Sequence, residues 1–302
     1  MAQAIHTAVI PAAGFGTRML PITKSLSKEM LPLVDKPILQ VVIEELVEAG
    51  IRNIIIVTMP HKTDIADYFG PVQPELAALL GGGDSAKQAI LRQLEDVQHL
   101  ADFTFIEQQG VYGTGTPVLC AAPYVGNQPF IYTFADDFFI AKENSYVQML
   151  QAYERHAAPV IACQVRTAPQ DYLAYAYMDG AQVHPGEVRV RAMIEKPGKD
   201  RAPGDLASIG GFIVTPEVLP YLQRAKAELP AGRELFFNSA FDRMLADGKT
   251  LIAREIKDAQ YFDTGKKLEY MKTSVAMAAR HPEIGADFMT FLRDFVKERT
   301  EQ

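Results

Sequence analysis

The stretch AVIPAAGFGTRMLPITKSLSKEMLPLVDKP, from Ala8 to Pro37, decides the fold. Its apolar start predicts a strand over Thr7–Pro11, and two glycines, Gly14 and Gly16, follow directly. A dinucleotide-binding fingerprint requires a third glycine three residues later, where this chain has Met19. A Walker A loop requires Gly-Lys-Ser/Thr after a four-residue gap, and this stretch has no such run. The loop therefore matches neither of these two patterns.

The residues that follow the loop predict an α/β fold. Pro37 opens the pattern ILQVVIEELVEAG, whose apolar side chains fall on one helical face and which ends at Gly50. Asn53–Thr58 is a continuous β-branched run, typical of a strand buried on both faces of a parallel sheet. Together they predict a right-handed βαβ unit. The alternation continues with strands expected over Phe103–Glu107, Phe130–Phe134 and Pro159–Val165, and helices over Pro117–Ala122 and Ser145–His156. We therefore expect a doubly wound, mostly parallel, Rossmann-like sheet.

The second half of the chain mixes shorter strands with helices. Strands are expected over Tyr172–Met178, Val188–Ile194, Ser208–Val214 and Leu251–Ile256. The last stretch, Lys266–Glu301, is strongly helical, with one break at His281 and Pro282. Its apolar side chains are Met271, Val275, Met277, Phe288, Phe291, Leu292 and Phe295. We expect these terminal helices to cover the sheet or to form a subunit interface.

Composition excludes several classes of function. The chain has 302 residues and a formal net charge of −7, without the basic surplus of a nucleic-acid-binding protein. The N-terminal residues lack the basic start and long apolar core of a signal peptide, and no apolar run is long enough to span a membrane. Cys120 and Cys163 lie far apart in apolar runs, so we interpret them as buried thiols rather than as a disulfide or metal site. A reducing, cytoplasmic setting is expected.

The glycine loop carries the residues that could bind phosphate. A loop directly after the first strand lies at the carboxyl edge of the sheet, where ligands of open α/β folds bind. Glycine allows the backbone to approach a ligand and direct its N–H groups toward it. Arg18 can hold phosphate oxygens bidentately, and Lys24 and Lys28 add mobile positive charge. The alternative for Gly-x-Gly alone is a tight turn with solvated charges.

A family resemblance favours the phosphate interpretation. Gly14-Phe-Gly16-Thr17-Arg18, followed by Lys28-Glu29-Met30-Leu31-Pro32 and Lys36-Pro37, resembles the signature of sugar-phosphate nucleotidylyltransferases. The later matches, in order, are Gly113-Thr-Gly115, Val118–Pro123, Asp136-Asp137, Glu195-Lys196-Pro197, Ile209-Gly210, Thr215-Pro-Glu217 and Asp263-Thr-Gly265. Each piece is weak alone, but the ordered set is specific and runs almost from end to end.

The resemblance implies a reaction and an architecture. A sugar 1-phosphate oxygen would attack the α-phosphorus of UTP and release pyrophosphate, with Mg²⁺, Arg and Lys neutralising charge. Glucose 1-phosphate is the expected sugar substrate. The expected domain spans residues 1–265, with a nucleotide half over about 1–140 and a mixed β sugar-binding half over about 141–265. Residues 266–302 would form the C-terminal helices. A homo-oligomer, dimer or tetramer, is expected, with no nucleic-acid or membrane partner.

The resemblance also implies roles for individual residues. Asp136 and Asp263 would hold Mg²⁺, and Arg18, Lys28 and Lys196 would be catalytic. Nucleotide binding would fall to Ala13, Gly14, Gly16, Thr17, Glu29, Gln108 and Gly113, and sugar binding to Ala176, Glu195 and Gly210. Asp136 follows an expected strand, and Mg²⁺ takes one or two carboxylates beside phosphates. The amide of Gln108 offers a donor and an acceptor to a pyrimidine edge. Without the resemblance, Asp136-Asp137 and Glu195-Lys196 would be ordinary turn residues.

Several positions depart from the pattern of the family. The departures are Ser27 for a proline, Glu107 for an arginine, Ala135 and Ala176 for glycines, and the divergent stretch GRELFFNSAF, Gly232–Phe241. They leave open transfer from another nucleotide such as dTTP, another sugar 1-phosphate, or a weakly active regulatory homologue. An oxidoreductase is disfavoured because the second strand ends in Thr58-Met59-Pro60, without an acidic residue for a ribose.

Overall fold

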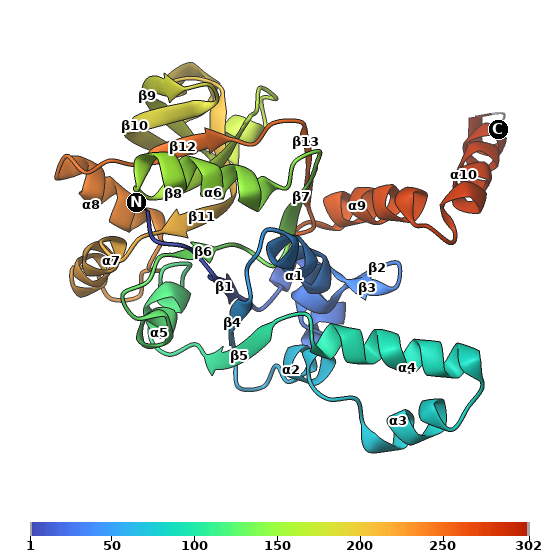
Figure 1. Ribbon diagram of the computed structural model, residues 1–302. Coiled ribbons are helices and arrows are strands. Elements are labelled where there is room, and N and C mark those ends of the chain that lie inside the picture. The colour runs from blue at the N-terminus through green and yellow to red at the C-terminus, as the bar shows by residue number, and fades with distance from the viewer. Residues whose placement is uncertain (1, 301–302) are drawn as a thin grey trace.

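A nine-stranded sheet runs through the molecule in the computed structural model, which describes residues 2–300 (Figure 1). The strand order is β5-β4-β1-β6-β11-β8-β12-β10-β9. The strands are β1 (Thr7–Pro11), β4 (Asn53–Thr58), β5 (Asp102–Glu107), β6 (Phe130–Tyr132), β8 (Val160–Val165), β9 (Ala176–His184), β10 (Glu187–Glu195), β11 (Leu206–Val214) and β12 (Ile252–Glu255). Because one sheet crosses both expected halves, the division near residue 140 stays a prediction.

The direction of the strands changes along this sheet. β5, β4, β1 and β6 are mutually parallel, as the βαβ pattern predicted. β11 is antiparallel to both β6 and β8, and only β12 and β8 are parallel in the remainder. The α/β doubly wound fold is thus confirmed, with a parallel first half and a mixed second half.

Helices cover both faces of the sheet. They are α1 (Ile38–Glu48), α2 (Asp64–Phe69), α3 (Pro74–Gly81), α4 (Ser85–Gln98), α5 (Thr116–Val125), α6 (Ser145–His156), α7 (Val218–Ala227), α8 (Asn238–Ala246), α9 (Lys267–Arg280) and α10 (Gly285–Thr300). Along β1, Ala8 and Ile10 join the apolar core that includes α1 and α6, while Val9 joins the core that includes α5, α7 and α8. This alternation explains why the three central residues of β1, Ala8, Val9 and Ile10, are all apolar.

One expected strand was wrong in its first half. Tyr172–Met178 was predicted as a strand, but Asp171–Leu173 forms a short 3₁₀ turn and β9 begins only at Ala176. The Tyr172 ring stacks on Tyr177 at 4.5 Å between ring centroids, and its hydroxyl donates a hydrogen bond to Asp205. An aromatic residue such as Tyr172 is typical of a strand, but here its ring packs against a neighbouring ring and its backbone does not pair in the sheet.

Two small antiparallel ribbons complete the fold. β2 (Pro32–Leu33) pairs with β3 (Lys36–Pro37), just after the glycine loop. β7 (Asp137–Ala141) pairs with β13 (Ala259–Asp263), in a register that places Asp263 opposite Asp137. This second ribbon brings together two acidic segments that lie more than a hundred residues apart in the sequence.

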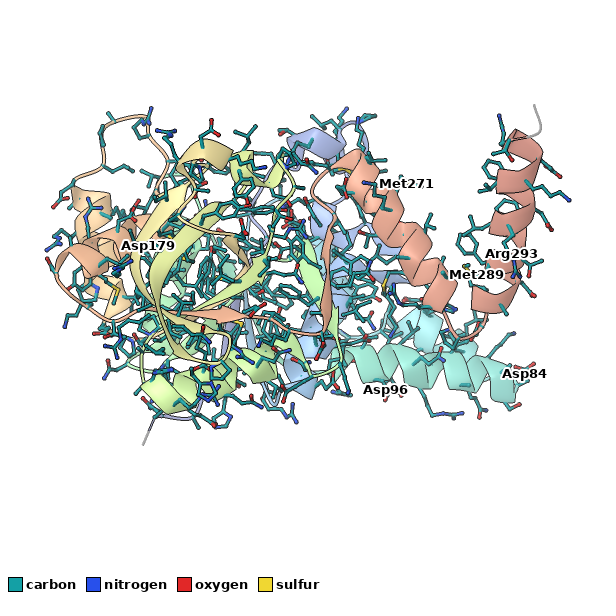
Figure 2. The ribbon with its side chains drawn as sticks, turned by 90° about the horizontal axis from the view of Figure 1, so that it is seen from above. Asp84, Asp96, Asp179, Met271, Met289 and Arg293 are labelled. Carbon is teal, nitrogen blue, oxygen red and sulfur yellow. The ribbon has the colours of Figure 1, made fainter. Side chains whose placement is uncertain are left out.

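The C-terminal helices α9 and α10 extend away from the sheet, with a break at the predicted place. α9 ends at Arg280 and α10 begins at Gly285. α10 stands apart from the body of the molecule in two perpendicular views (Figures 1 and 2). The sheet is therefore not covered by α10. Within residues 2–300 no helix combines the length and apolar character that crossing a membrane requires.

Candidate active site

Three adjoining cavities lie at the carboxyl ends of the parallel strands and continue over β11. The loop cavity, of 290 Å³, is lined by residues 14–19 of the glycine loop together with Lys28, Tyr112 and Gly265. The central cavity, of 180 Å³, lies between Gly14, Gln108 and Asp136. The distal cavity, of 270 Å³, is bordered by Ala176, Glu195 and Gly210. Gly14, Lys28 and Tyr112 are shared by the first two cavities, and Thr114 and Phe134 by the last two.

The glycine loop presents free backbone donors to these cavities. Within residues 2–300, no backbone carbonyl accepts a hydrogen bond from the N–H of Ala13, Gly14 or Phe15. A methyl group on Gly14 would lie 3.6 Å from Lys28 Cε and 3.8 Å from the Tyr112 hydroxyl, so the protein leaves room there. Gly16 instead needs its glycine, because its φ is +61° and its neighbours Thr23 and Lys28 are close. Thr17 and Arg18 continue the lining of the loop cavity.

Lys28 forms an ion pair with Asp136 between the loop and central cavities. Lys28 Nζ lies 2.5 Å from Asp136 Oδ2. Burial disfavours the charged forms of both groups, but the attraction between opposite charges outweighs it. Lys28 lowers the pKa of Asp136, and Asp136 and Glu29 raise the pKa of Lys28. Both groups are therefore charged at neutral pH.

Asp136 and Asp263 converge on one point, as expected for two ligands of one cation. A methyl group on Gly265 would lie 3.1 Å from Asp263 Oδ1, 3.3 Å from Asp136 Oδ2 and 3.2 Å from Arg18 Nη2. Within residues 2–300 no group of three or more His, Cys, Asp or Glu side chains could hold a metal ion alone. Two carboxylates beside a basic loop fit Mg²⁺, which takes few protein carboxylates and completes its shell with phosphate and water oxygens.

Glu29 does not line the three cavities, in contrast to the prediction that it binds nucleotide. Its carboxylate is fully buried, and burial raises its pKa. Glu29 Oε2 accepts a hydrogen bond of 3.3 Å from Lys62, a residue that the sequence did not single out. Lys62 Nζ also donates to the carbonyls of Ala12, at 2.9 Å, and Gly14, at 2.7 Å. The available signal was a basic residue four positions after the second parallel strand.

Ser27 is held firmly although it lacks the rigidity of the proline usual at this position. Its N–H and hydroxyl donate to the two carboxylate oxygens of Asp64, both at 2.7 Å. The Ser27 side chain is buried, so these bonds are shielded from water. The side chain of Asp64, at the start of α2, therefore fixes the backbone that carries Lys28.

The central cavity has an amide side chain at its edge, as predicted. Gln108 follows β5, lines the cavity, and is anchored by its N–H, which donates to the Thr58 carbonyl at 2.8 Å. Gly113 also lines the central cavity, but packing requires a glycine there, because a methyl group would lie 2.4 Å from the Leu235 carbonyl oxygen. Glu107, the charge reversal seen in the sequence, is exposed and outside the three cavities.

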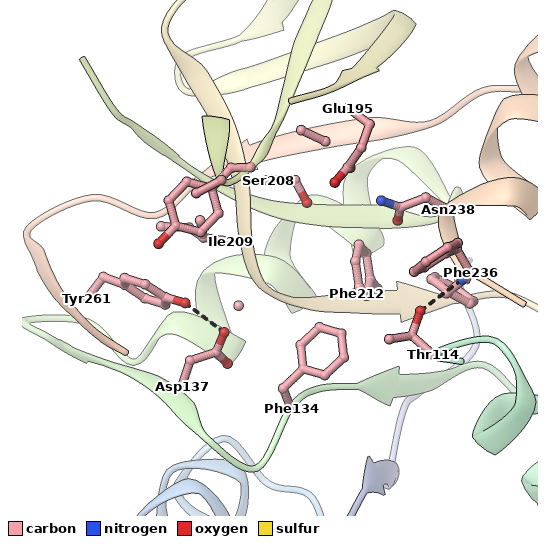
Figure 3. A pocket seen from close by; sticks show the side chains of 15 residues that line it. Thr114, Phe134, Asp137, Glu195, Ser208, Ile209, Phe212, Phe236, Asn238 and Tyr261 are labelled. Carbon is pink, nitrogen blue, oxygen red and sulfur yellow. Dashed lines mark hydrogen bonds between the residues drawn. The ribbon is translucent and has the colours of Figure 1, made fainter. Parts of the chain in front are cut away.

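The distal cavity combines aromatic walls with a few polar groups (Figure 3). Phe134, Phe212 and Phe236 form apolar walls, and the polar side chains of Asp137, Glu195, Asn238 and Tyr261 are drawn around the same space. The sequence predicted Ala176, Glu195 and Gly210 here, and all three line it. Gly210 has a φ of +85°, and a methyl group on it would lie 2.8 Å from the Phe139 ring.

Asp137 is the distal-cavity residue that sequence reasoning left without a role. Its Oδ2 accepts a hydrogen bond of 2.7 Å from the Tyr261 hydroxyl. Its Oδ1 is buried without a partner among residues 2–300. Burial, followed by the charge of Asp136, raises the pKa of Asp137 to about 8. A buried, unpartnered oxygen beside a cavity is a place where a ligand hydroxyl can bind.

Lys196 lies beside the distal cavity rather than in it. It lines a neighbouring cavity of 320 Å³ that shares Glu195 and Asn238 with the distal one. Its side chain is 56% exposed and its Nζ lies 3.6 Å from Glu195 Oε1. The backbone at Lys196 has a φ of +45°, an uncommon value for a residue with a side chain, and its N–H donates to the Tyr175 carbonyl.

Known proteins resemble this chain over nearly its whole length. One UTP–glucose-1-phosphate uridylyltransferase, from Streptococcus pneumoniae serotype 4, is 37% identical over 308 aligned positions that cover 100% of both chains. A UDP-glucose pyrophosphorylase structure from Acinetobacter baumannii superimposes with a TM-score of 0.86 at 29% identity and covers 97% of this chain and 100% of its own. A UDP-glucose pyrophosphorylase complexed with UDP-glucose gives 0.80 at 30% identity, covering 92% of this chain and 100% of its own.

The same likeness holds at the level of the family. The model of the nucleotidyl transferase family matches residues 7–280, which include β1, the residues that line the three cavities, Asp136 and Asp263. This match covers far more than half of the chain, and it agrees with the free amides, the Lys28–Asp136 pair and the convergent carboxylates. The chain belongs to the nucleotidyl transferase family.

Proposed function

We propose that this chain transfers a uridylyl group from UTP to glucose 1-phosphate, giving UDP-glucose and pyrophosphate. Relatives named UTP–glucose-1-phosphate uridylyltransferase match between 96% and 100% of this chain. The observation that carries the proposal is that the loop and distal cavities both adjoin the central cavity, which is lined by the Lys28–Asp136 ion pair. The central cavity, which Asp136 lines, lies between the loop cavity with its free N–H groups and the distal cavity with its aromatic walls and polar side chains.

The loop and central cavities take UTP in this proposal. Ala13, Gly14 and Gln108 meet the uracil, while Gly113 shapes the wall beside it. The Gly16 and Thr17 backbone and the Arg18 guanidinium meet the triphosphate, where a fixed fork of donors holds oxygens bidentately. A backbone cradle of this kind positions an anion without reorganising when it binds.

The metal belongs between Asp136 and Asp263. Mg²⁺ supplies neutralisation of phosphate charge there when it is bound. Asp136 is poised for this role because its carboxylate is ionised and faces Asp263 across the space beside Gly265. Lys28, its partner in this structure, is free to move its ammonium group to a phosphate oxygen once another cation takes its place.

The distal cavity takes the sugar phosphate. Glu195 and the free Oδ1 of Asp137 form hydrogen bonds with sugar hydroxyls, and the Ala176 and Gly210 backbone borders the ring. Lys196, exposed at the rim, neutralises the sugar phosphate and directs its oxygen toward the α-phosphorus. In-line attack then requires only that the two bound substrates be held in contact.

The terminal helices support self-association. Exposed apolar side chains gather on α9 and α10; they include Leu268, Met271, Phe291, Phe295 and Val296. We expect a dimer or a tetramer, since a face of this kind is unusual on a monomer. The cytoplasmic setting expected from the sequence stays a prediction.

A matrix of substrates tests the proposed reaction. The purified chain is incubated with UTP, dTTP, ATP or GTP against glucose 1-phosphate and other sugar 1-phosphates, with Mg²⁺, and pyrophosphate release is followed. We expect the UTP and glucose 1-phosphate pair to turn over fastest. A higher rate with dTTP or another sugar would correct the substrates, and UTP binding without turnover in any pair would indicate a regulatory homologue.

A further inference from the structure

Lys62 holds the glycine loop from the side away from the cavities. It lies in the turn between β4 and α2, its side chain is only 10% exposed, and it lines none of the loop, central and distal cavities. Its ammonium group donates to the carbonyls of Ala12 and Gly14. Three donor hydrogens and three acceptors, the third on Glu29, satisfy this buried ammonium completely.

These bonds determine where the free N–H groups of the loop point. In a trans peptide the carbonyl and the N–H of the same unit point in opposite directions. The Ala12 carbonyl shares its peptide with the Ala13 N–H, and the Gly14 carbonyl shares its peptide with the Phe15 N–H. Because Lys62 holds both carbonyls, both N–H groups point away from Lys62. Ala13 lines the central cavity and Phe15 the loop cavity, so both peptide units border the space where a ligand would lie.

Glu29 supplies the charge that allows a lysine at this position. A buried ammonium needs a counter-ion, and the Glu29 carboxylate is fully buried next to it. Glu29 also directly follows Lys28, whose ammonium pairs with Asp136. Lys62 therefore joins two segments of the long loop, residues 12–14 and residues 28–29, through one buried ion pair.

We propose that Lys62 is a positioning residue for the nucleoside triphosphate, acting through the Ala13 and Phe15 amides that it aims at the nucleotide. Lys62 contacts neither substrate. Its role is to keep two peptide units in one orientation, so that the loop binds its anion without first being ordered. The inference rests on the proposed function only for the identity of the nucleotide, UTP.

Direct titration with UTP tests the proposal. UTP binding is measured by calorimetry without sugar phosphate, for the wild type, Lys62→Met, Lys62→Arg and a control, Lys142→Met, at an exposed lysine after β7. We expect Lys62→Met to weaken UTP binding about tenfold or more, since bonds from a charged donor are lost. The KM for glucose 1-phosphate should stay near the wild-type value. Lys62→Arg, which keeps charged donors, should recover much of the affinity, and the control should behave as wild type.

A second pair of variants separates positioning from folding. Lys62→Met leaves the buried Glu29 charge with only the longer, 4.0 Å ion pair to Lys28, so the variant can fail to fold. The double variant Lys62→Met with Glu29→Gln removes both charges and should fold, yet it should still bind UTP weakly. Glu29→Gln alone keeps the bonds from Lys62 to the carbonyls and should bind UTP more tightly than the double variant.

The results that would overturn the proposal are distinct. A folded Lys62→Met or double variant with wild-type UTP affinity contradicts it, as does an equal loss of affinity for both substrates. Failure of every Lys62 variant to fold would assign this lysine a purely structural role, which also contradicts it. If the wild type binds another nucleotide instead of UTP, the proposed reaction is at fault, and the same series with that nucleotide tests Lys62.

Discussion

At the scale of single residues, the two glycines of the loop are present for different reasons. Gly14 has room for a methyl group and no left-handed φ, whereas Gly16 has a φ of +61° and crowded neighbours. We expect Gly14→Ala to keep its thermal stability but to weaken UTP binding, because the methyl group enters the cavity. Gly16→Ala should lose about 1 kcal/mol or more of unfolding free energy through backbone strain. Thermal melts and UTP titrations on both variants check this; matching losses of stability would contradict it.

Lys28 and a divalent cation compete for the same carboxylate. Lys28 Nζ lies 2.5 Å from Asp136 Oδ2, so a cation that binds Asp136 must displace it. We expect Lys28→Met to bind Mn²⁺ more tightly than the wild type in the absence of nucleotide, while its kcat falls. Mn²⁺ binding is measured by electron paramagnetic resonance, with Lys24→Met as the control at an exposed lysine of the same loop. Unchanged or weaker Mn²⁺ binding in Lys28→Met would show that Lys28 does not occupy the metal position.

Some of the residues at these cavities could be predicted from the sequence, but the side-chain contacts that hold them could not. Gly14, Arg18, Asp136 and Asp263 could be found because each is part of a local pattern. The partners Lys62 for Glu29 and Asp64 for Ser27 could not, because each contact joins segments more than thirty residues apart and depends on side-chain burial. The family resemblance assigned Glu29 to the nucleotide together with its neighbour Lys28, but successive residues of the 3₁₀ turn Lys28–Met30 point in different directions.

At the scale of elements, the first half of the sheet could be predicted from the sequence, but the strand order of the second half could not. Buried parallel strands are apolar runs with helices between them, so β1, β4 and α1 were found within a residue or two. The insertion of β11 between β6 and β8 leaves no local mark in the sequence. The β7–β13 ribbon is likewise non-local, yet it is what brings Asp263 to Asp136.

A buried carboxylate joins elements of the second half and gives stability a dependence on pH. Glu187, the first residue of β10, is fully buried and pairs with Arg155 and His156 of α6, His184 of β9 and Arg254 of β12. Burial opposes its charge, but hydrogen bonds from Arg155 and His156 lower its pKa below the ordinary 4.5. The stabilisation is therefore complete above about pH 4.5 and is lost as pH falls through the lowered value.

The Glu187 prediction is tested by unfolding at several pH values. We expect Glu187→Gln to lose about 3 kcal/mol of unfolding free energy at pH 7, because Arg254 is left without its buried partner. The difference from the wild type should shrink as the pH is lowered below about 4. Urea unfolding at pH 7, 5 and 3.5 measures it, with Glu255→Gln on β12 as a less buried control. A difference that stays constant with pH would contradict the assignment.

At the scale of the whole molecule, α10 contacts α9 but leaves several of its apolar side chains exposed. Its apolar side chains Phe291, Phe295 and Val296 are 58%, 44% and 57% exposed, and it stands apart from the sheet (Figures 1 and 2). Burying such a face is favourable by roughly 25 cal/mol per Å² of apolar area. The sequence predicted covering or association for these helices, and the geometry favours association because the sheet lies out of reach of α10.

Association through α10 can be separated from catalysis. We expect the double variant Phe291→Ser with Phe295→Ser to lower the molecular mass measured by light scattering, while the rate per chain with UTP and glucose 1-phosphate stays near the wild-type value. The three cavities contain no residue of α10, so the reaction should not depend on it. Tyr124→Ser on α5, which is 60% exposed, is the matched control and should keep the wild-type mass. An unchanged mass in the double variant would show that the subunits meet elsewhere. A monomeric wild type would show that the chain does not associate.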